Sequence, residues 1–152
     1  MATRLNLKLL VLLAVMPVIG SAAPPTYELM TTSPEFTLRG VIENAVIAKI
    51  STLNREFIIG VAESQISELR DPKTKEILTK ATKYGIQIYG CESHLLKNKI
   101  GIGALPSMVK WVPDETPRYD IKGNLIPNSN VLSDSVPYAK KLRTMCGAKD
   151  VQ

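Results

Sequence analysis

The sequence predicts an α/β protein in which helices pack on a mostly parallel sheet. Short apolar runs of strand length alternate with longer segments whose apolar residues recur at helical spacing, from about residue 27 to residue 112. One run, Glu56–Ala62 (EFIIGVA), is continuously apolar and rich in β-branched residues, as is typical of a parallel strand covered on both faces. Right-handed crossovers between such strands are expected to place helices on both faces of the sheet.

The first strand is predicted at Tyr27–Thr32, which is short and alternates apolar and polar residues. Ser33 and Pro34 then indicate a helix start, since serine is a favoured N-cap and proline is tolerated at the first helical position. The helix is expected to run to about Ser51 or Thr52, and its apolar stripe consists of Leu38, Val41, Ile42, Ala45 and Ala48. Glu56–Ala62 provides the second strand.

A second start signal opens the next unit of the pattern. Asp71–Pro72 repeats the combination of cap and proline, and Gly85 is a helix-ending glycine. After it the sequence predicts a strand over 86–89, a short helix over 92–98 and a strand over 108–112 (MVKWV).

Beyond Pro113 the alternation stops. Asp114–Pro137 contains several prolines, asparagines and serines with little periodicity and predicts a long loop or surface arm. Ser135–Met145 is a candidate for a final helix, with Tyr138, Leu142 and Met145 as its apolar positions. The α/β domain is therefore assigned to residues 23–113 and an irregular arm to residues 114–152.

The first 22 residues have the pattern of a secretory signal peptide. Arg4 and Lys8 precede an apolar stretch of about a dozen residues, and Gly20-Ser21-Ala22 supplies small residues for cleavage after Ala22. The apolar stretch is shorter than the ~20 residues that span a bilayer. We therefore expect an exported protein, periplasmic or secreted, without stable membrane insertion.

The charge of the mature chain is mild. Removing the two basic residues of the leader lowers the formal net charge from +5 to +3. The lysines are spread along helical faces and are not interleaved with aromatic residues, which disfavours a nucleic-acid binder. His94 is the only histidine, and Gly101-Ile102-Gly103 lacks the third glycine of a dinucleotide fingerprint. No cofactor or metal is predicted.

Cys91 is the main candidate for chemistry because it ends a predicted strand just before a predicted helix. Ligands and catalytic groups of open α/β sheets collect at the carboxyl ends of the strands, and Ser93 and His94 would support a thiol there with hydrogen bonds. From the residues alone three interpretations stay open. Cys91 is a nucleophilic or sulfur-carrying thiol, a buried inert thiol, or one half of a disulfide with Cys146, which would close a loop of about 55 residues.

Residues 84–113 (YGIQIYGCESHLLKNKIGIGALPSMVKWVP) resemble the second half of the DsrE/DsrF-like sulfur-relay family. The shared pattern is a glycine, a strand, a cysteine followed by glutamate, a short helix and a strand ending in valine-proline, and the upstream segment 27–61 is also similar. The resemblance implies a flavodoxin-like three-layer sandwich with four or five strands, assembled as trimers or hexamers. It also implies that Cys91 carries sulfur as a persulfide between donor and acceptor proteins.

The resemblance favours Cys91 as a working, sulfur-handling thiol. The competing hypothesis is a non-enzymatic, oligomeric binding or scaffold module whose cysteines are structural. The long arm favours this second hypothesis, since such arms often exchange between subunits.

Overall fold

The structure is a computed structural model that describes residues 24–115, 118–126 and 131–148. The leader expected at residues 1–22 lies outside the described residues. None of the helices in the described part of the chain has the length and apolar character needed to cross a bilayer.

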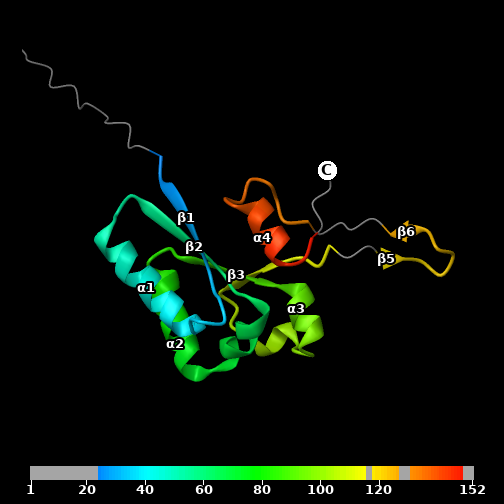
Figure 1. Cartoon of the computed structure of the whole chain (residues 1–152), viewed down its shortest axis with the longest axis horizontal. Helices are drawn as coiled ribbons and strands as arrows, with labels where there is room; N and C mark the ends of the chain where they lie inside the picture. The colour runs from blue at the N-terminus through cyan, green and yellow to red at the C-terminus, as the bar shows by residue number, and fades with distance from the viewer. Residues whose placement is uncertain (1–23, 116–117, 127–130, 149–152) are drawn as a thin grey trace, which may run out of the picture.

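Four parallel strands form the central sheet (Figure 1). They are β1 (Thr26–Thr31), β2 (Arg55–Gly60), β3 (Gln87–Cys91) and β4 (Val109–Val112), and they lie side by side in chain order. Helices alternate with these strands along the chain, so the predicted α/β class with a parallel sheet is confirmed.

The connections between successive strands carry five helical segments. They are α1 (Leu38–Ser51), the 3₁₀ segment η1 (Glu63–Arg70), α2 (Pro72–Lys83), α3 (Glu92–Lys97) and the 3₁₀ turn η2 (Ile102–Ala104). The segment before Asp71 reads as polar in the sequence, but η1 buries Gln65, Ile66 and Leu69. It therefore belongs to the packed layer and is not a surface loop.

Side chains of β2 alternate between two hydrophobic clusters, one on each face of the sheet. Phe57 and Ile59 belong to the larger cluster, whereas Ile58 between them belongs to the smaller one. The larger cluster contains the buried apolar residues of α1, η1, α2 and α3. The smaller one contains Ile58, Tyr89, Val112 and Leu142.

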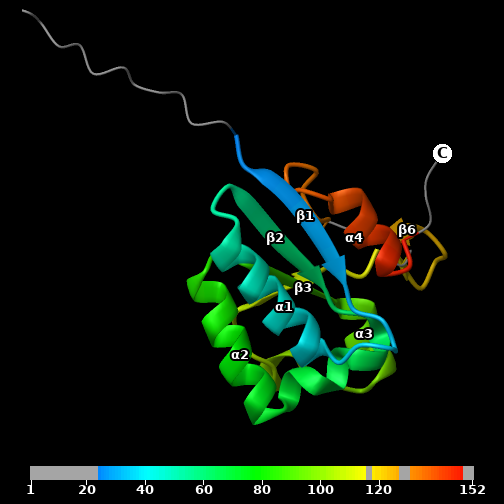
Figure 2. The same ribbon diagram turned by 60° about the vertical axis from the view of Figure 1, so that its left-hand side comes forward.

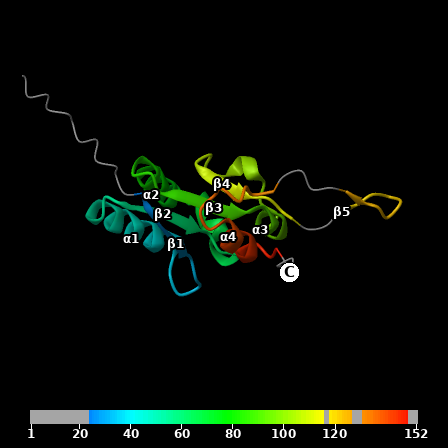
Figure 3. The same ribbon diagram turned by 90° about the horizontal axis from the view of Figure 1, so that it is seen from above.

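The second face of the sheet is covered differently from the prediction. All crossover helices with buried apolar residues contribute to the larger cluster, because strands in sequential order with crossovers of one hand place their helices on one face. The opposite face is covered by the C-terminal helix α4 (Ala139–Met145). Figures 2 and 3 show α4 and α1 on opposite sides of the sheet. Three layers therefore form, and the third layer comes from the end of the chain.

The start of α1 also differs from the prediction. The helix begins at Leu38, and the hydroxyl of Thr37 accepts a hydrogen bond from the Gly40 amide at 3.1 Å. Ser33 and Phe36 lie in a preceding turn, where the side chain of Gln65 donates hydrogen bonds to both of their carbonyl oxygens. Contacts from η1 hold this turn, so a local capping signal at Ser33 is not used.

The boundaries of α2 follow the local signals. Asp71 caps the helix by accepting a hydrogen bond from the Lys73 amide at 2.8 Å, and Pro72 is the first helical residue. Gly85 follows the helix with a φ of 79°, a conformation that favours glycine. Both predictions are confirmed.

The arm after β4 contains regular structure that the sequence did not indicate. Two short strands, β5 (Arg118–Tyr119) and β6 (Leu125–Ile126), pair antiparallel. The carboxylate of Asp120 accepts hydrogen bonds from the amides of Lys122 and Asn124 and closes the turn between them. In Figure 1 this hairpin stands apart from the sheet, with the fully exposed side chain of Ile121 at its turn.

Candidate functional site at the carboxyl edge of the sheet

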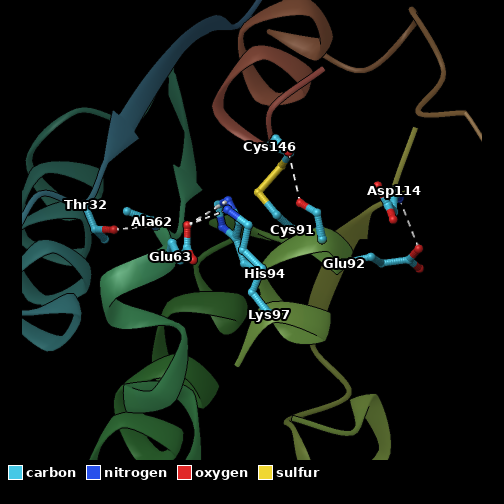
Figure 4. The surroundings of a disulfide bond; sticks show 10 residues. Thr32, Ala62, Glu63, Cys91, Glu92, His94, Lys97, Asp114 and Cys146 are labelled. Atoms are coloured by element: carbon cyan, nitrogen blue, oxygen red, sulfur yellow. Dashed lines mark hydrogen bonds and ion pairs between the residues drawn. A yellow bond between two sulfur atoms is a disulfide. The ribbon is translucent and has the colours of Figure 1, made fainter. Parts of the chain in front are cut away.

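The carboxyl ends of β1, β2 and β3 meet at one edge of the sheet, because the strands are parallel and in register. Thr32 follows β1, Ala62 and Glu63 come shortly after β2, and Cys91 is the last residue of β3. Figure 4 shows these residues together with His94 and Cys146. This is the edge at which open α/β sheets place ligands and catalytic groups.

Cys91 and Cys146 form a disulfide, with their Cα atoms 5.3 Å apart and a separation of 55 positions in the sequence. The described part of the chain contains no free cysteine. The structure therefore contains the disulfide, which is one of the three interpretations that the residues left open. The position predicted for Cys91 is also found, since it ends β3 and α3 begins at the next residue.

The disulfide ties α4 to the end of β3. Cys91 has no exposed surface, and Cys146 is half-buried at the C-cap of α4. The hydroxyl of Ser93 donates a hydrogen bond to the carbonyl oxygen of Cys146 at 3.0 Å. Ser93, predicted to support a thiol, thus contributes to docking the helix in this oxidised form.

His94 points away from α4, toward the start of η1 (Figure 4). Its Nε2 lies 4.0 Å from Oε2 of Glu63, and Nζ of Lys97 lies 3.2 Å from the same oxygen. The side chain is about nine-tenths buried, and its buried Nδ1 has no hydrogen-bond partner.

Burial decides the charge of His94. Desolvation lowers the pKa of its imidazole, and the nearby ammonium of Lys97 lowers it further, while the carboxylate of Glu63 opposes both. The ring is therefore neutral near pH 7, and its approach to Glu63 is a polar contact between α3 and η1 and not an ion pair. Glu63 pairs instead with Lys97.

Two further hydrogen bonds fasten the loops of this edge. The Thr32 hydroxyl accepts a hydrogen bond from the Ala62 amide at 2.7 Å, and a carboxylate oxygen of Glu92 accepts one from the Asp114 amide at 3.2 Å. The first joins the chain after β1 to the chain after β2. The second joins α3 to the segment after β4. The polar groups of the edge are thus used to hold its loops together.

Sequence reasoning placed Ser93 and His94 beside Cys91 and offered Cys146 as its partner in one of three open interpretations, and the structure brings all four residues to this edge. Sequence reasoning did not identify Glu63 or Lys97 as neighbours of His94. The available signal for Glu63 was its position just after the second strand, because such residues lie at the same edge as Cys91.

Open grooves lie elsewhere on the molecule. One of about 470 Å³ runs between α1 and α2 and is lined mainly by charged side chains. Another of about 480 Å³ lies at the amino edge of the sheet, around residues 51–55. No group of three or more potential metal ligands is found among the described residues.

Trp111 is partly buried and packs against the larger cluster. Its indole ring covers its β3 partner Gly90 so closely that a Cβ atom there would lie 2.5 Å from Cζ3.

Comparison of the sequence with protein-family models and with curated proteins finds no match to either. The resemblance to the sulfur-relay family therefore rests on the residues quoted for it. The function has to be argued from the site.

Proposed function

We propose that this protein is an exported, non-enzymatic binding or scaffold module whose two cysteines form a structural disulfide. One observation carries the proposal: Cys91 is completely buried and bonded to Cys146. The atom that would have to accept sulfur is thus already used to hold α4 on the sheet.

The surroundings of the disulfide support the same proposal. The side chains of Ser93, Glu92 and Thr32 make hydrogen bonds that fix local structure. A disulfide also agrees with the oxidising compartment to which the signal-like leader would direct the chain. Together these features favour a rigid module over a reactive thiol.

The state of the cysteines in the native protein tests this proposal. Protein isolated from its own compartment into an alkylating reagent should carry no label, and its intact mass should rise by two hydrogens after reduction. Labelling after reduction and denaturation provides the control that both thiols can react. A stoichiometric free thiol in the native protein would contradict the structural role.

A second candidate is a sulfur carrier, and the position of Cys91 favours it. The cysteine stands at the end of a parallel strand and directly before a helix, where the resemblance to the sulfur-relay family places the sulfur-handling residue. In this reaction the Cys91 thiolate would attack the terminal sulfur of a donor persulfide and become a persulfide itself, and the donor would leave as a thiolate. The disulfide must be reduced first.

The two candidates differ in the mass of the reduced protein after exposure to a persulfide donor. A carrier should gain one sulfur atom on Cys91, and the gain should be absent in Cys91→Ser and present in Cys146→Ser. A structural pair should gain none under conditions in which the fold is kept.

Self-association into trimers or hexamers remains part of the proposal. Its support in this chain is a set of exposed large apolar side chains, among them Phe36, Ile47, Ile50 and Leu53. Light scattering of the mature protein over a wide concentration range should show a species larger than a monomer. A monomer throughout the range would exclude the oligomeric form.

A further inference from the structure

The two halves of the disulfide differ in how an external reagent can reach them. A thiolate that breaks a disulfide attacks one sulfur along the S–S axis and expels the other. The space behind the sulfur of Cys91 lies inside the protein, since this residue has no exposed surface. Cys146 is half-buried at a helix end, and the next residue, Gly147, is exposed. Of the two cysteines, Cys146 is therefore the one that has exposed surface in the folded protein.

We propose that Cys146 is the site at which an external thiol opens this disulfide, and that opening it releases α4 from the sheet. The thiolate attacks Sγ of Cys146 and forms a mixed disulfide with it, and Cys91 leaves as a thiolate that takes a proton from water. A second thiol then attacks the sulfur of the first reagent, and Cys146 leaves as a thiolate. The net reaction oxidises two thiols to a disulfide and reduces the protein disulfide to two thiols.

Release of α4 follows from the short length of the helix and from the position of the disulfide at its C-terminal end. The helix has seven residues, too few to persist without tertiary contacts. Besides the disulfide, the helix is held by the buried side chains of Ala139 and Leu142, by Met145, whose sulfur lies over Gly60, and by the hydrogen bond from Ser93 to its C-terminal end. At its N-terminal end the hydroxyl of Tyr138 donates a hydrogen bond to the Tyr27 carbonyl oxygen at 2.9 Å.

The uncovered surface would be the apolar second face of the sheet. Ile58, Tyr89 and Val112 are at most 3% exposed while Leu142 covers them. The crossover face has its own cluster, with buried residues from α1, η1, α2 and α3 that do not depend on α4. Reduction is therefore expected to open one face of the protein while the rest of the fold is kept.

The first test locates the mixed disulfide. The folded wild-type protein is mixed with reduced glutathione, samples are quenched with acid, and the glutathione adduct is located by peptide mass mapping. We expect the adduct on Cys146 at least tenfold more often than on Cys91. We also expect a reduction rate that rises in proportion to glutathione concentration. A preference for Cys91, or a rate that is independent of glutathione because it is set by global unfolding, would overturn the proposal.

The second test follows α4 by limited digestion with trypsin. After reduction, cleavage at Lys141 and Arg143 in α4 should become at least tenfold faster, while cleavage at Lys75 and Lys80 in α2 should keep its rate. The exposed lysines of α2 are the internal control because they lie on the face that α4 does not cover. Binding of an apolar fluorescent dye should rise in parallel.

The Cys91→Ser/Cys146→Ser variant provides the matched control, since it should show fast α4 cleavage with or without reductant. If this variant does not fold, the native wild type reduced with glutathione provides the same measurement. Unchanged protection of α4 in reduced protein would refute the proposed release of this helix. An equal increase at the α2 sites would refute it as well, because the whole domain would then have opened.

Discussion

Replacement of Cys146 by serine is expected to lower the free energy of unfolding by between about 2 and 4 kcal/mol. The disulfide closes a loop of 55 residues. In the chain-entropy model the loss of this cross-link returns about 14 cal/mol/K to the unfolded chain, or about 4 kcal/mol at 25 °C. Detachment of α4 would also return some conformational freedom to the native state. The loss of about 4 kcal/mol in the free energy of unfolding is therefore an upper limit.

Urea unfolding of the oxidised wild type and of Cys146→Ser, followed by far-UV circular dichroism and by Trp111 fluorescence, measures this difference. Reduced wild type is the matched control and should lose a similar amount. The double variant Cys91→Ser/Cys146→Ser should not lose the contribution of the cross-link a second time, because Cys146→Ser has already removed the disulfide. A loss below about 1 kcal/mol would refute the loop-closure argument.

Three further changes probe the packing, the buried histidine and the docking of α4. Gly90→Ala should destabilise the protein by about 1–3 kcal/mol and shift Trp111 fluorescence, because the new methyl group would overlap the indole ring; an unfolding midpoint equal to that of wild type would contradict this. Burial lowers the pKa of His94 in the folded protein. As the pH falls below about 6.5, the imidazole is therefore protonated more readily in the unfolded chain than in the folded protein, and the folded state loses stability toward lower pH. Urea midpoints between pH 5 and pH 8 should therefore depend less on pH in His94→Gln, and an unchanged slope would count against the buried neutral form. Tyr138→Phe removes the hydrogen bond to the Tyr27 carbonyl oxygen and should cost about 0.5–1.5 kcal/mol in oxidised protein; an unaltered unfolding midpoint would mean that this contact does not help to hold the arm.

The sequence by itself determined the class of the fold and the ends of several elements. The alternation of apolar runs with helical patterns is a local property of neighbouring residues, and so are the cap at Asp71 with Pro72 and the glycine at position 85. The position of Cys91 at the end of a strand followed from the same kind of signal. These signals act within a few residues and do not depend on the rest of the chain.

Only the tertiary structure decided which distant residues meet. The sequential strand order leaves one face of the sheet without crossover helices, and α4 returns from the end of the chain to cover it. The turn at Ser33 is held by Gln65, and this contact moved the start of α1 to Leu38. Such contacts depend on how the whole chain packs and cannot be predicted from the residues next to each other in the sequence.

The candidate site shows the same division. Sequence reasoning identified Cys91, Ser93, His94 and Cys146 but left three interpretations of Cys91 open, because the pairing of two cysteines depends on the separation of their Cα atoms in space. Packing of α4 against β3 sets that separation at 5.3 Å and buries Cys91. Burial likewise keeps His94 neutral, and proximity in the folded chain pairs Glu63 with Lys97. Desolvation and proximity belong to the folded chain, and for this reason only the tertiary structure could assign the chemistry of these residues.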